Sequence, residues 1–463
     1  MQFINCPIKF SFMIIDRFRF LLFFCFVIIL SSCEKDNSLT DKQDDQNNLV
    51  ELELITINIP DNLLNQYIIN AVVFASKMDG SLLSSQRFNN SDKTVTLYTE
   101  EEIPLDEEFM VTFAVTDNGL ATGLSTYANI TKEKLSSINL KTSIRLTEGS
   151  NTNFGAFGFE PTDNVSSFVG INSFDIPIML YLNQSREDFN IIIGAGLTEP
   201  VESVYIFGQP NIDFDEYAYL LLDLPLENDF VLDKSKFLTE GIQTKFFNIS
   251  KPENMVEDES SSMVLYGYLN DNDKEKHRYH SMSFTGAYTQ SENEYNVNPI
   301  FSDYWFSINN GAYYAERKGL PIVNYVIPEL AIDYTLTGKK INVNITGAEH
   351  EVGKIQLQDY DNENLIGYSW IFNFDSKTTS SIIIPKLPAE MATTMLQGYY
   401  DNNTFKVGSV EVYNYFGLNN YKGYLNNLVK NQDHLFDGSD GFEMISNSDF
   451  QYYNSPIKDN TFH

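Results

Sequence analysis

The sequence predicts an all-β protein made of tandem antiparallel β-sandwiches. Residues 51–59, ELELITINI, alternate apolar and polar side chains with a period of two, which is the pattern of a half-buried strand. Residues 67–75 and 109–116 are runs of β-branched and aromatic residues of strand length, and Asp79-Gly80 after the first run is a hairpin turn signal. No long amphipathic helix pattern separates these runs. Short turns should therefore join consecutive strands, which makes the sheets antiparallel.

The chain begins with the pattern of a secretion signal. Residues 20–30 form an apolar run that follows Arg17 and Arg19. This run is shorter than the roughly 20 residues that a membrane-spanning helix needs. It ends in Leu30-Ser31-Ser32-Cys33, which resembles the lipobox of bacterial lipoproteins. The resemblance implies a signal peptide over residues 1–32, cleavage before Cys33, and attachment of lipid to Cys33, which would hold the protein on a membrane.

Residues 33–48 are predicted to be a flexible acidic tether, since they contain no aromatic and a single aliphatic side chain. The opening Cys33-Glu34-Lys35-Asp36 resembles the surface-export signal of lipoproteins from Bacteroidota. That resemblance implies an outer-membrane lipoprotein that faces the cell exterior, with the periplasmic face as the alternative. The start codon is either Met1 or Met13, which stands directly before the basic flank.

Beyond the tether, composition and strand patterns divide the chain into three predicted domains and a tail. A β-sandwich over 49–144 is followed by a larger sandwich-like domain over 145–328 and a third sandwich over 329–428. These sandwiches are expected to be Ig-like or transthyretin-like. Residues 429–463 are rich in Gly, Asp and Asn and are predicted to be a polar C-terminal tail.

Their sequence patterns predict that the first and third domains are two copies of one module. Residues 55–59 and 341–345 share the pattern of a first strand, and strand–turn–strand units follow both. The alignment pairs Asp79 with Asn362 in the two turns, and residues 109–118 with 394–402 as a closing strand. The alternative is that any two small sandwiches share such spacing.

Charge and cysteine content exclude several classes of function. The formal net charge is −32, and without residues 1–32, which hold three basic residues and one acidic residue, it is −34. Such a surface repels nucleic acid, so no nucleic-acid partner is expected. The three cysteines are Cys6, Cys25 and Cys33, of which two leave with the signal and one is lipidated. Thiol catalysis, disulfides and cysteine-ligated metals are therefore excluded from the folded body.

Aromatic residues among amides form the candidate ligand-binding surface. Tyr304, Trp305, Tyr313 and Tyr314 lie close together in the sequence, next to Asn309 and Asn310. Flat rings with hydrogen-bonding neighbours suit rigid polar ligands such as sugars. The alternative is that alternate rings on strands belong to the sandwich core. Trp305 decides between the two, because a ring that binds ligand must be exposed.

One acidic stretch is a candidate calcium site. Asp359, Asp361 and Glu363 place oxygen ligands at alternate positions, but the EF-hand glycine and its closing glutamate are missing. A hairpin turn is the alternative, and no other cofactor is expected. His277 and His280 lack the carboxylate of a zinc-protease motif and are predicted to lie in a surface loop. No single stretch holds a complete catalytic or metal-binding set.

Together these features favour a lipid-anchored surface protein that acts as a non-catalytic binding or scaffold module. Its expected partners are the membrane, through lipidated Cys33, and either polysaccharide or an outer-membrane protein complex. One alternative is a structural subunit similar to the fimbrillins. The other is a glycan-active enzyme whose pair of carboxylates the sequence does not locate.

Overall fold

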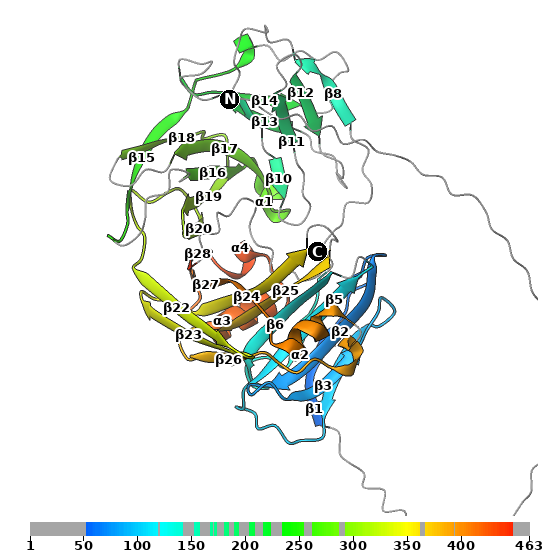
Figure 1. The fold of residues 1–463 in the computed structure, drawn as a ribbon. Coiled ribbons are helices and arrows are strands. Elements are labelled where there is room, and N and C mark those ends of the chain that lie inside the picture. Colours follow the sequence, from blue (N-terminus) through cyan, green and yellow to red (C-terminus); the bar gives the residue numbers. More distant parts are fainter. Residues whose placement is uncertain are drawn as a thin grey trace, which may run out of the picture. The chain divides into compact units, whose positions relative to one another are not determined.

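The computed structural model describes residues 52–118, 121–141, 203–208, 216–223, 234–253, 262–286, 292–361, 366–392 and 394–447, together with the backbone of five strands between 152 and 193. All of these residues belong to one compact unit, Val50–His463. Strands dominate this unit and helices are short, so the predicted all-β fold class is confirmed (Figure 1). Within the described residues, no helix is long and apolar enough to span a bilayer.

The first module consists of seven strands that form two packed sheets. They are β1 (Leu52–Asn58), β2 (Ile68–Lys77), β3 (Leu82–Arg87), β4 (Thr94–Thr99), β5 (Phe109–Asp117), β6 (Thr122–Ile130) and β7 (Ser137–Asn139). One sheet has the order β4-β1-β7, with β1 and β7 parallel, and the strands β3-β2-β5-β6 form the other layer. The predicted hairpin turn is present, since Gly80 has a φ of +83° and its N–H donates to the Lys77 carbonyl.

The middle module repeats this strand order. Its strands are β15 (Gln243–Ser250), β16 (Ser262–Tyr268), β17 (Arg278–Gly286), β18 (Glu292–Val297), β19 (Asp303–Asn310), β20 (Tyr313–Lys318) and β21 (Asn324–Val326), with helix α1 (Asp271–Glu275) between β16 and β17. Strand β15 pairs antiparallel with β18 and parallel with β21, as β1 does with β4 and β7. The order β17-β16-β19-β20 matches β3-β2-β5-β6.

Shorter elements precede this module along the chain. They are β8 (Thr152–Phe157), β9 (Ser167–Val169), β10 (Ile171–Ser173), β11 (Leu180–Gln184), β12 (Phe189–Ile193), β13 (Ser203–Gly208), β14 (Ala218–Asp223) and the 3₁₀ turn η1 (Lys234–Lys236). They form the small sheets β11-β12-β8 and β14-β13-β9, while β10 extends the middle module by pairing with β17.

The third module has a related order and more helical turns. Its elements are β22 (Leu330–Thr337), β23 (Lys340–Gly347), β24 (Val352–Asp361), β25 (Ile366–Asp375), β26 (Ser381–Ile383), η2 (Ala389–Met391), α2 (Met395–Asn402), β27 (Val407–Tyr415), α3 (Tyr421–Tyr424), the π turn η3 (Leu425–Val429), α4 (Leu435–Gly438) and β28 (Gly441–Ser446). The order β25-β24-β27-β28 again matches β3-β2-β5-β6. The place of β5 is taken by β27, so the predicted closing strand over 394–402 is wrong because most of it is helix α2.

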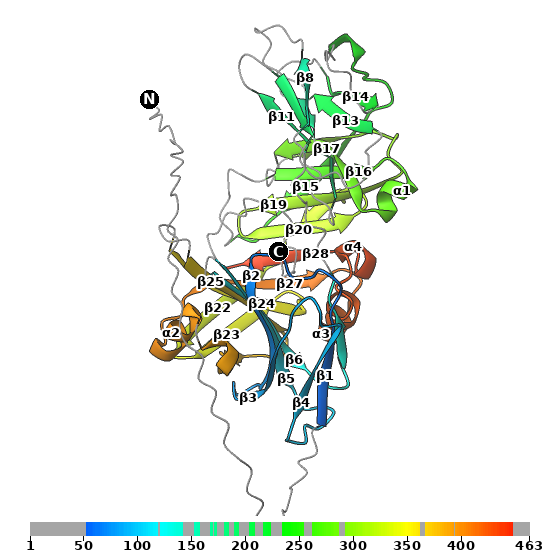
Figure 2. The ribbon, with the colours of Figure 1, turned by 90° about the vertical axis from the view of Figure 1, so that its right-hand side faces the viewer.

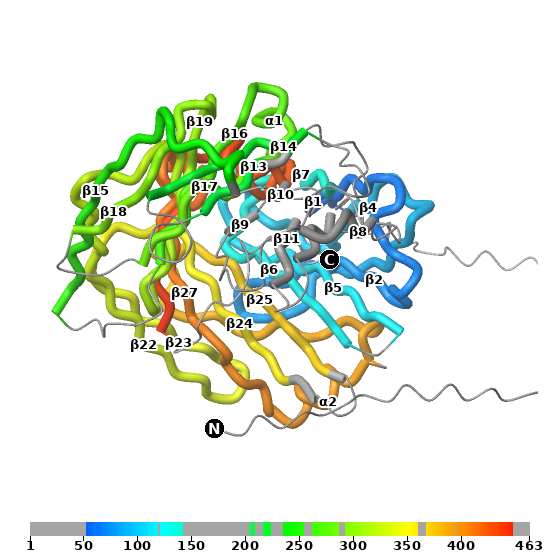
Figure 3. Tube along the Cα trace, turned by 90° about the horizontal axis from the view of Figure 1, so that it is seen from above, coloured from blue at the N-terminus to red at the C-terminus, as the bar shows by residue number. Residues whose placement is uncertain are grey.

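One sheet of 13 strands passes through all three modules, in the order β10-β17-β16-β19-β20-β28-β27-β24-β25-β6-β5-β2-β3 (Figure 2). Two junctions connect the modules. Strand β25 pairs parallel with β6 of the first module, and Figure 3 shows β24, β25, β6 and β5 side by side. Strand β28 pairs antiparallel with β20 on one side and β27 on the other. Part of the predicted polar tail is therefore a central strand of this sheet.

Both faces of the sheet are covered in the first and third modules. On β2, Val73 and Ala75 lie in the core beneath β1, while Val72 and Phe74 lie in a second core with Trp370 of β25. A strand that is buried on both faces carries a continuous apolar run, which explains why residues 109–116 do not alternate. The shared cores and the shared backbone hydrogen bonds hold the first and third modules together.

Candidate functional site

The predicted aromatic surface is contradicted at two of its four residues. Trp305 is 2% exposed and stacks on Tyr266, with a ring-centroid distance of 3.9 Å. Tyr313 is fully buried, and its hydroxyl lies 2.6 Å from that of Tyr325. Neither ring is open to a ligand. The alternative reading, that these rings belong to the core, applies to both.

Strand geometry also separates the four rings. Neighbouring residues on a strand point to opposite faces. On β19, Tyr304 packs against the core between the two sheets of the middle module, whereas Trp305 lies in a separate cluster with Tyr268, Tyr279 and Phe436. Tyr304 and Tyr314 are half-buried, and the Tyr314 hydroxyl donates to Glu316 Oε1 at 2.5 Å. The four rings therefore do not form one site.

The other predicted site residues lie partly or wholly outside the described residues. Asp359 is half-buried, and it forms an ion pair with Lys406 at 2.8 Å and accepts a hydrogen bond from Tyr399 at 3.2 Å. The Asp361 side chain, Glu363 and Cys33 lie outside the described residues. The calcium site and the lipidation site therefore stay predictions.

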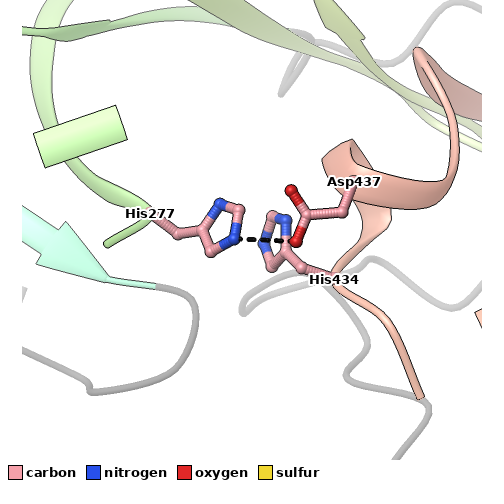
Figure 4. A group of neighbouring side chains, drawn as sticks. All are labelled: His277, His434 and Asp437. Carbon is pink, nitrogen blue, oxygen red and sulfur yellow. Dashed lines mark hydrogen bonds and ion pairs between the residues drawn. The ribbon is translucent and has the colours of Figure 1, made fainter. Parts of the chain in front are cut away.

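A different cluster is formed by His277, His434 and Asp437 (Figure 4). Each residue offers one potential ligand atom, and these atoms all lie within 4.8 Å of one another. His277 Nε2 and Asp437 Oδ2 are 3.1 Å apart, and the two imidazole rings stack with their centroids 3.8 Å apart. Two imidazoles and a carboxylate are a donor set that suits transition metals such as zinc.

Local backbone structure fixes His277. Asn270 caps the N-terminus of helix α1, and its side chain accepts a hydrogen bond from the Asp273 N–H. His277 then adopts a left-handed conformation with φ of +48°, and its N–H donates to the Lys274 carbonyl. A non-glycine residue in this region is uncommon. This turn ends the helix directly before β17.

The other two residues come from the predicted tail. His434 precedes α4, and its Nδ1 accepts a hydrogen bond from the Phe436 N–H at 3.1 Å. Phe436 is buried against Trp305, with the two ring centroids 5.4 Å apart. The contact between these rings places the short helix on the face of the middle module, next to His277.

The structure separates the two histidines of the HRYH stretch. The predicted surface loop is wrong, because residues Arg278–Gly286 form β17 and His280 is 1% exposed. Burial, together with the nearby charge of Arg278, lowers the pKa of His280 to about 3, so His280 is neutral. His277 instead meets His434 and Asp437, which sequence reasoning missed. The Asp437–His277 pair is separated by 160 positions, so no local motif contains it.

Among the described acidic residues of the middle module, Glu316 on β20 has the most strongly shifted pKa. It is fully buried, and burial raises its pKa to about 7, although the hydrogen bond from Tyr314 opposes the rise. Its Oε2 has no hydrogen-bond partner among the described residues. Glu316 lies opposite Phe442 of β28 in the sheet, at the junction of the middle and third modules.

Replacing Glu316 with glutamine is expected to remove part of the pH dependence of stability. The folded-state pKa of about 7 exceeds the ordinary value of 4.5, so the folded state retains a proton that the unfolded chain loses between these values. The contribution of Glu316 to the free energy of unfolding is fully present below pH 4.5. It decreases by about 3 kcal/mol as the pH rises through the folded-state pKa of about 7. Urea unfolding at pH 5 and pH 8 should show this loss in the wild type and a smaller loss in Glu316→Gln. Equal losses in both proteins would contradict the assignment.

Comparisons with known proteins do not identify a family. No family model matches the chain, and no curated protein matches it. Solved structures give weak likenesses. One is a proposed adhesin from Bacteroides ovatus, at 9% identity and a TM-score of 0.14, which covers 65% of this chain and 96% of that one. Another comprises the four N-terminal Ig domains of Dscam1 isoform 9.44, at 8% identity and a TM-score of 0.13, covering 79% and 94%.

A third likeness is the SGBP-B protein of the mixed-linkage glucan utilization locus of Bacteroides ovatus, solved with a mixed-linkage heptasaccharide. It is 12% identical, with a TM-score of 0.09, and covers 81% of this chain and 96% of that one. Neither the fold nor the function of this chain is inferred from these likenesses.

Proposed function

We propose that this protein is a lipid-anchored, non-catalytic scaffold or binding module on the outer face of the outer membrane. The observation that carries the scaffold role is the sheet that continues through both module junctions. Backbone hydrogen bonds across β25–β6 and β20–β28 join the described parts of the modules at these two places. Such a body suits the presentation of a fixed surface at a distance from the membrane.

Anchoring rests on the lipobox-like Leu30-Ser31-Ser32-Cys33 and on the acidic tether that follows it. With a net charge of −34 after the signal, the body is repelled by anionic headgroups, so acyl chains on Cys33 must supply the membrane affinity. The tether separates the body from the bilayer. The Lys35-Asp36 pair supports display on the cell exterior.

The proposed binding partner is a polysaccharide or an outer-membrane protein complex. The burial of Trp305 and Tyr313 removes the rings that were expected to recognise sugar. Calorimetric titration of the purified protein with a polysaccharide panel tests this part directly. Heat of binding without release of products supports a non-catalytic module, whereas released sugar would identify an enzyme.

Replacing Cys33 with alanine is expected to abolish lipid attachment and leave the body folded. In detergent phase partitioning, the wild type should enter the detergent phase and Cys33→Ala the aqueous phase. Ser31→Ala is the matched control, because it keeps a small residue before the cysteine. Protease added to intact cells should remove the wild-type body. Fatty-acid labelling of Cys33→Ala would contradict the anchor, and protection in intact cells would contradict surface display.

A further inference from the structure

We propose that His277, His434 and Asp437 bind a divalent transition-metal ion of the zinc class. This inference is independent of the proposed scaffold role, since it rests on the geometry of the three side chains alone. Their potential ligand atoms all lie within 4.8 Å of one another, and the nearest pair, His277 Nε2 and Asp437 Oδ2, is already at 3.1 Å. Small side-chain rotations would let all three atoms converge on one ion.

The backbone on both sides of the cluster is held in place. His277 closes the turn between α1 and β17, and the Asp437 N–H donates to the His434 carbonyl at 2.9 Å. The α4 segment is further anchored by Phe436, which packs beside Trp305 in the buried cluster of the middle module. Metal binding would therefore need little movement of the backbone, and its main local cost is the hydrogen bond from the Phe436 N–H to His434 Nδ1.

The donor set selects the class of metal. Imidazole nitrogen suits zinc, copper, nickel and iron, whereas calcium and magnesium prefer a set made of oxygen ligands only. Three protein ligands leave a fourth position of a tetrahedral zinc site open. The Asp437 side chain is 58% exposed and that of His277 is 11% exposed, so water can reach the carboxylate side of the cluster.

Metal binding requires a rearrangement of protons. His434 Nδ1 accepts from the Phe436 N–H, so the proton of the neutral ring resides on Nε2. A metal bound at Nε2 uses the lone pair there and moves that proton to Nδ1. His434 Nδ1–H and the Phe436 N–H would then both be donors, so the hydrogen bond between them must break. At His277 the proton on Nε2 moves to Nδ1, and the hydrogen bond between His277 and Asp437 is replaced by two bonds to the ion.

Such an ion would link two segments that no local sequence connects. His277 stands directly before β17 of the middle module, whereas His434 and Asp437 stand before β28, which joins this module to the third one. The ion would thus fasten the C-terminal segment to the middle module. Its expected effect is structural, and it should appear as stabilisation of the folded protein.

The test is calorimetric titration of the full mature protein, without an affinity tag, after chelator treatment and dialysis. Zinc chloride is the probe and calcium chloride the comparator. We expect one zinc ion per chain, and no calcium at this site. His434→Ala should weaken zinc binding by more than about 100-fold, because loss of a group that only orients a ligand already costs about 10- to 100-fold. His350→Ala is the matched control, since His350 bonds to Ser376 away from the cluster.

A second variant covers the case in which His434→Ala does not fold. Asp437→Asn keeps an oxygen that can accept from His277 but removes the charge, and Asp437 is mostly exposed. It should fold and bind zinc at least about tenfold more weakly. Zinc should also raise the melting temperature of the wild type but not of His434→Ala. Absence of zinc uptake, or equal uptake by wild type and a His277→Ala/His434→Ala double variant, would overturn the proposal and leave a hydrogen-bonded contact only.

Discussion

Replacing Trp305 with alanine is expected to lower the free energy of unfolding by about 3–5 kcal/mol, the usual range for a buried tryptophan. The ring is 2% exposed, stacks on Tyr266 and meets Tyr279 edge to face at 4.9 Å. Its loss leaves a cavity under Phe436 as well, so the contact between α4 and the middle module should loosen. Urea unfolding of the wild type and the variant measures the difference.

The control for this prediction is an exposed ring on a strand. Tyr98 of β4 is 46% exposed, so Tyr98→Ala should change stability by less than about 0.5 kcal/mol. A small loss for Trp305→Ala, together with a loss of polysaccharide binding, would contradict the core assignment and restore the ligand-binding interpretation of this residue.

Replacing Gly441 with alanine is expected to disrupt the junction between the middle and third modules. Gly441 begins β28 with a φ of +121°, and a Cβ placed there would lie 2.1 Å from the Glu316 carbonyl oxygen. This oxygen belongs to the backbone of the paired strand β20, so it cannot move away as a flexible side chain could. Strain and overlap together should cost on the order of 3 kcal/mol or more, measured by urea unfolding.

The variant Gly319→Ala distinguishes backbone strain from the overlap of the added Cβ with its neighbours. Gly319 has a φ of +88° but nothing within 4 Å of the added Cβ, so this variant meets the backbone strain without the overlap. Its cost should be about 1 kcal/mol. If Gly441→Ala were no more harmful than Gly319→Ala, the close pairing of β28 with β20 would be contradicted.

The strands were predictable because their signals are local. Alternation over 51–59 and the Asp79-Gly80 turn correspond to β1 and to the β2–β3 hairpin. The helix α2 was missed although its pattern is also local. Met395, Leu396, Tyr399 and Tyr400 recur at the spacing of three to four residues that is typical of a helix, and Asn403 ends it in the left-handed conformation.

The role of the tail was not predictable from composition. Residues 441–446 form a central strand because they pair with β20 on one side and with β27 on the other. These two strands come from distant parts of the chain. The recurrence of one strand order in the middle module was missed as well. Strand order is defined by which strands pair with one another, and the residue pattern of a single strand does not reveal its partners.

The candidate metal cluster also depends on contacts between distant parts of the chain, which the sequence does not reveal. His434 and Asp437 have a spacing that places both on one face of a helical turn, so that pair could have been found. His277 could not be added to that pair from sequence, because it is the packing of Phe436 against Trp305 that brings the α4 segment next to it. The alternation of side chains along a strand is a local rule, and it would have separated Tyr304 from Trp305, which the predicted ligand-binding surface placed together.

The central claim is that β28 joins the middle and third modules into one sheet, and amide hydrogen exchange tests it most directly. Strand β28 is bonded on both sides, so its amides should be protected as strongly as those of the neighbouring β27. Exchange followed by mass spectrometry of peptides over 441–446 and 407–415 compares the two strands in one experiment. The account predicts slow exchange in both peptides, and rapid exchange over 441–446 beside a protected 407–415 would contradict it.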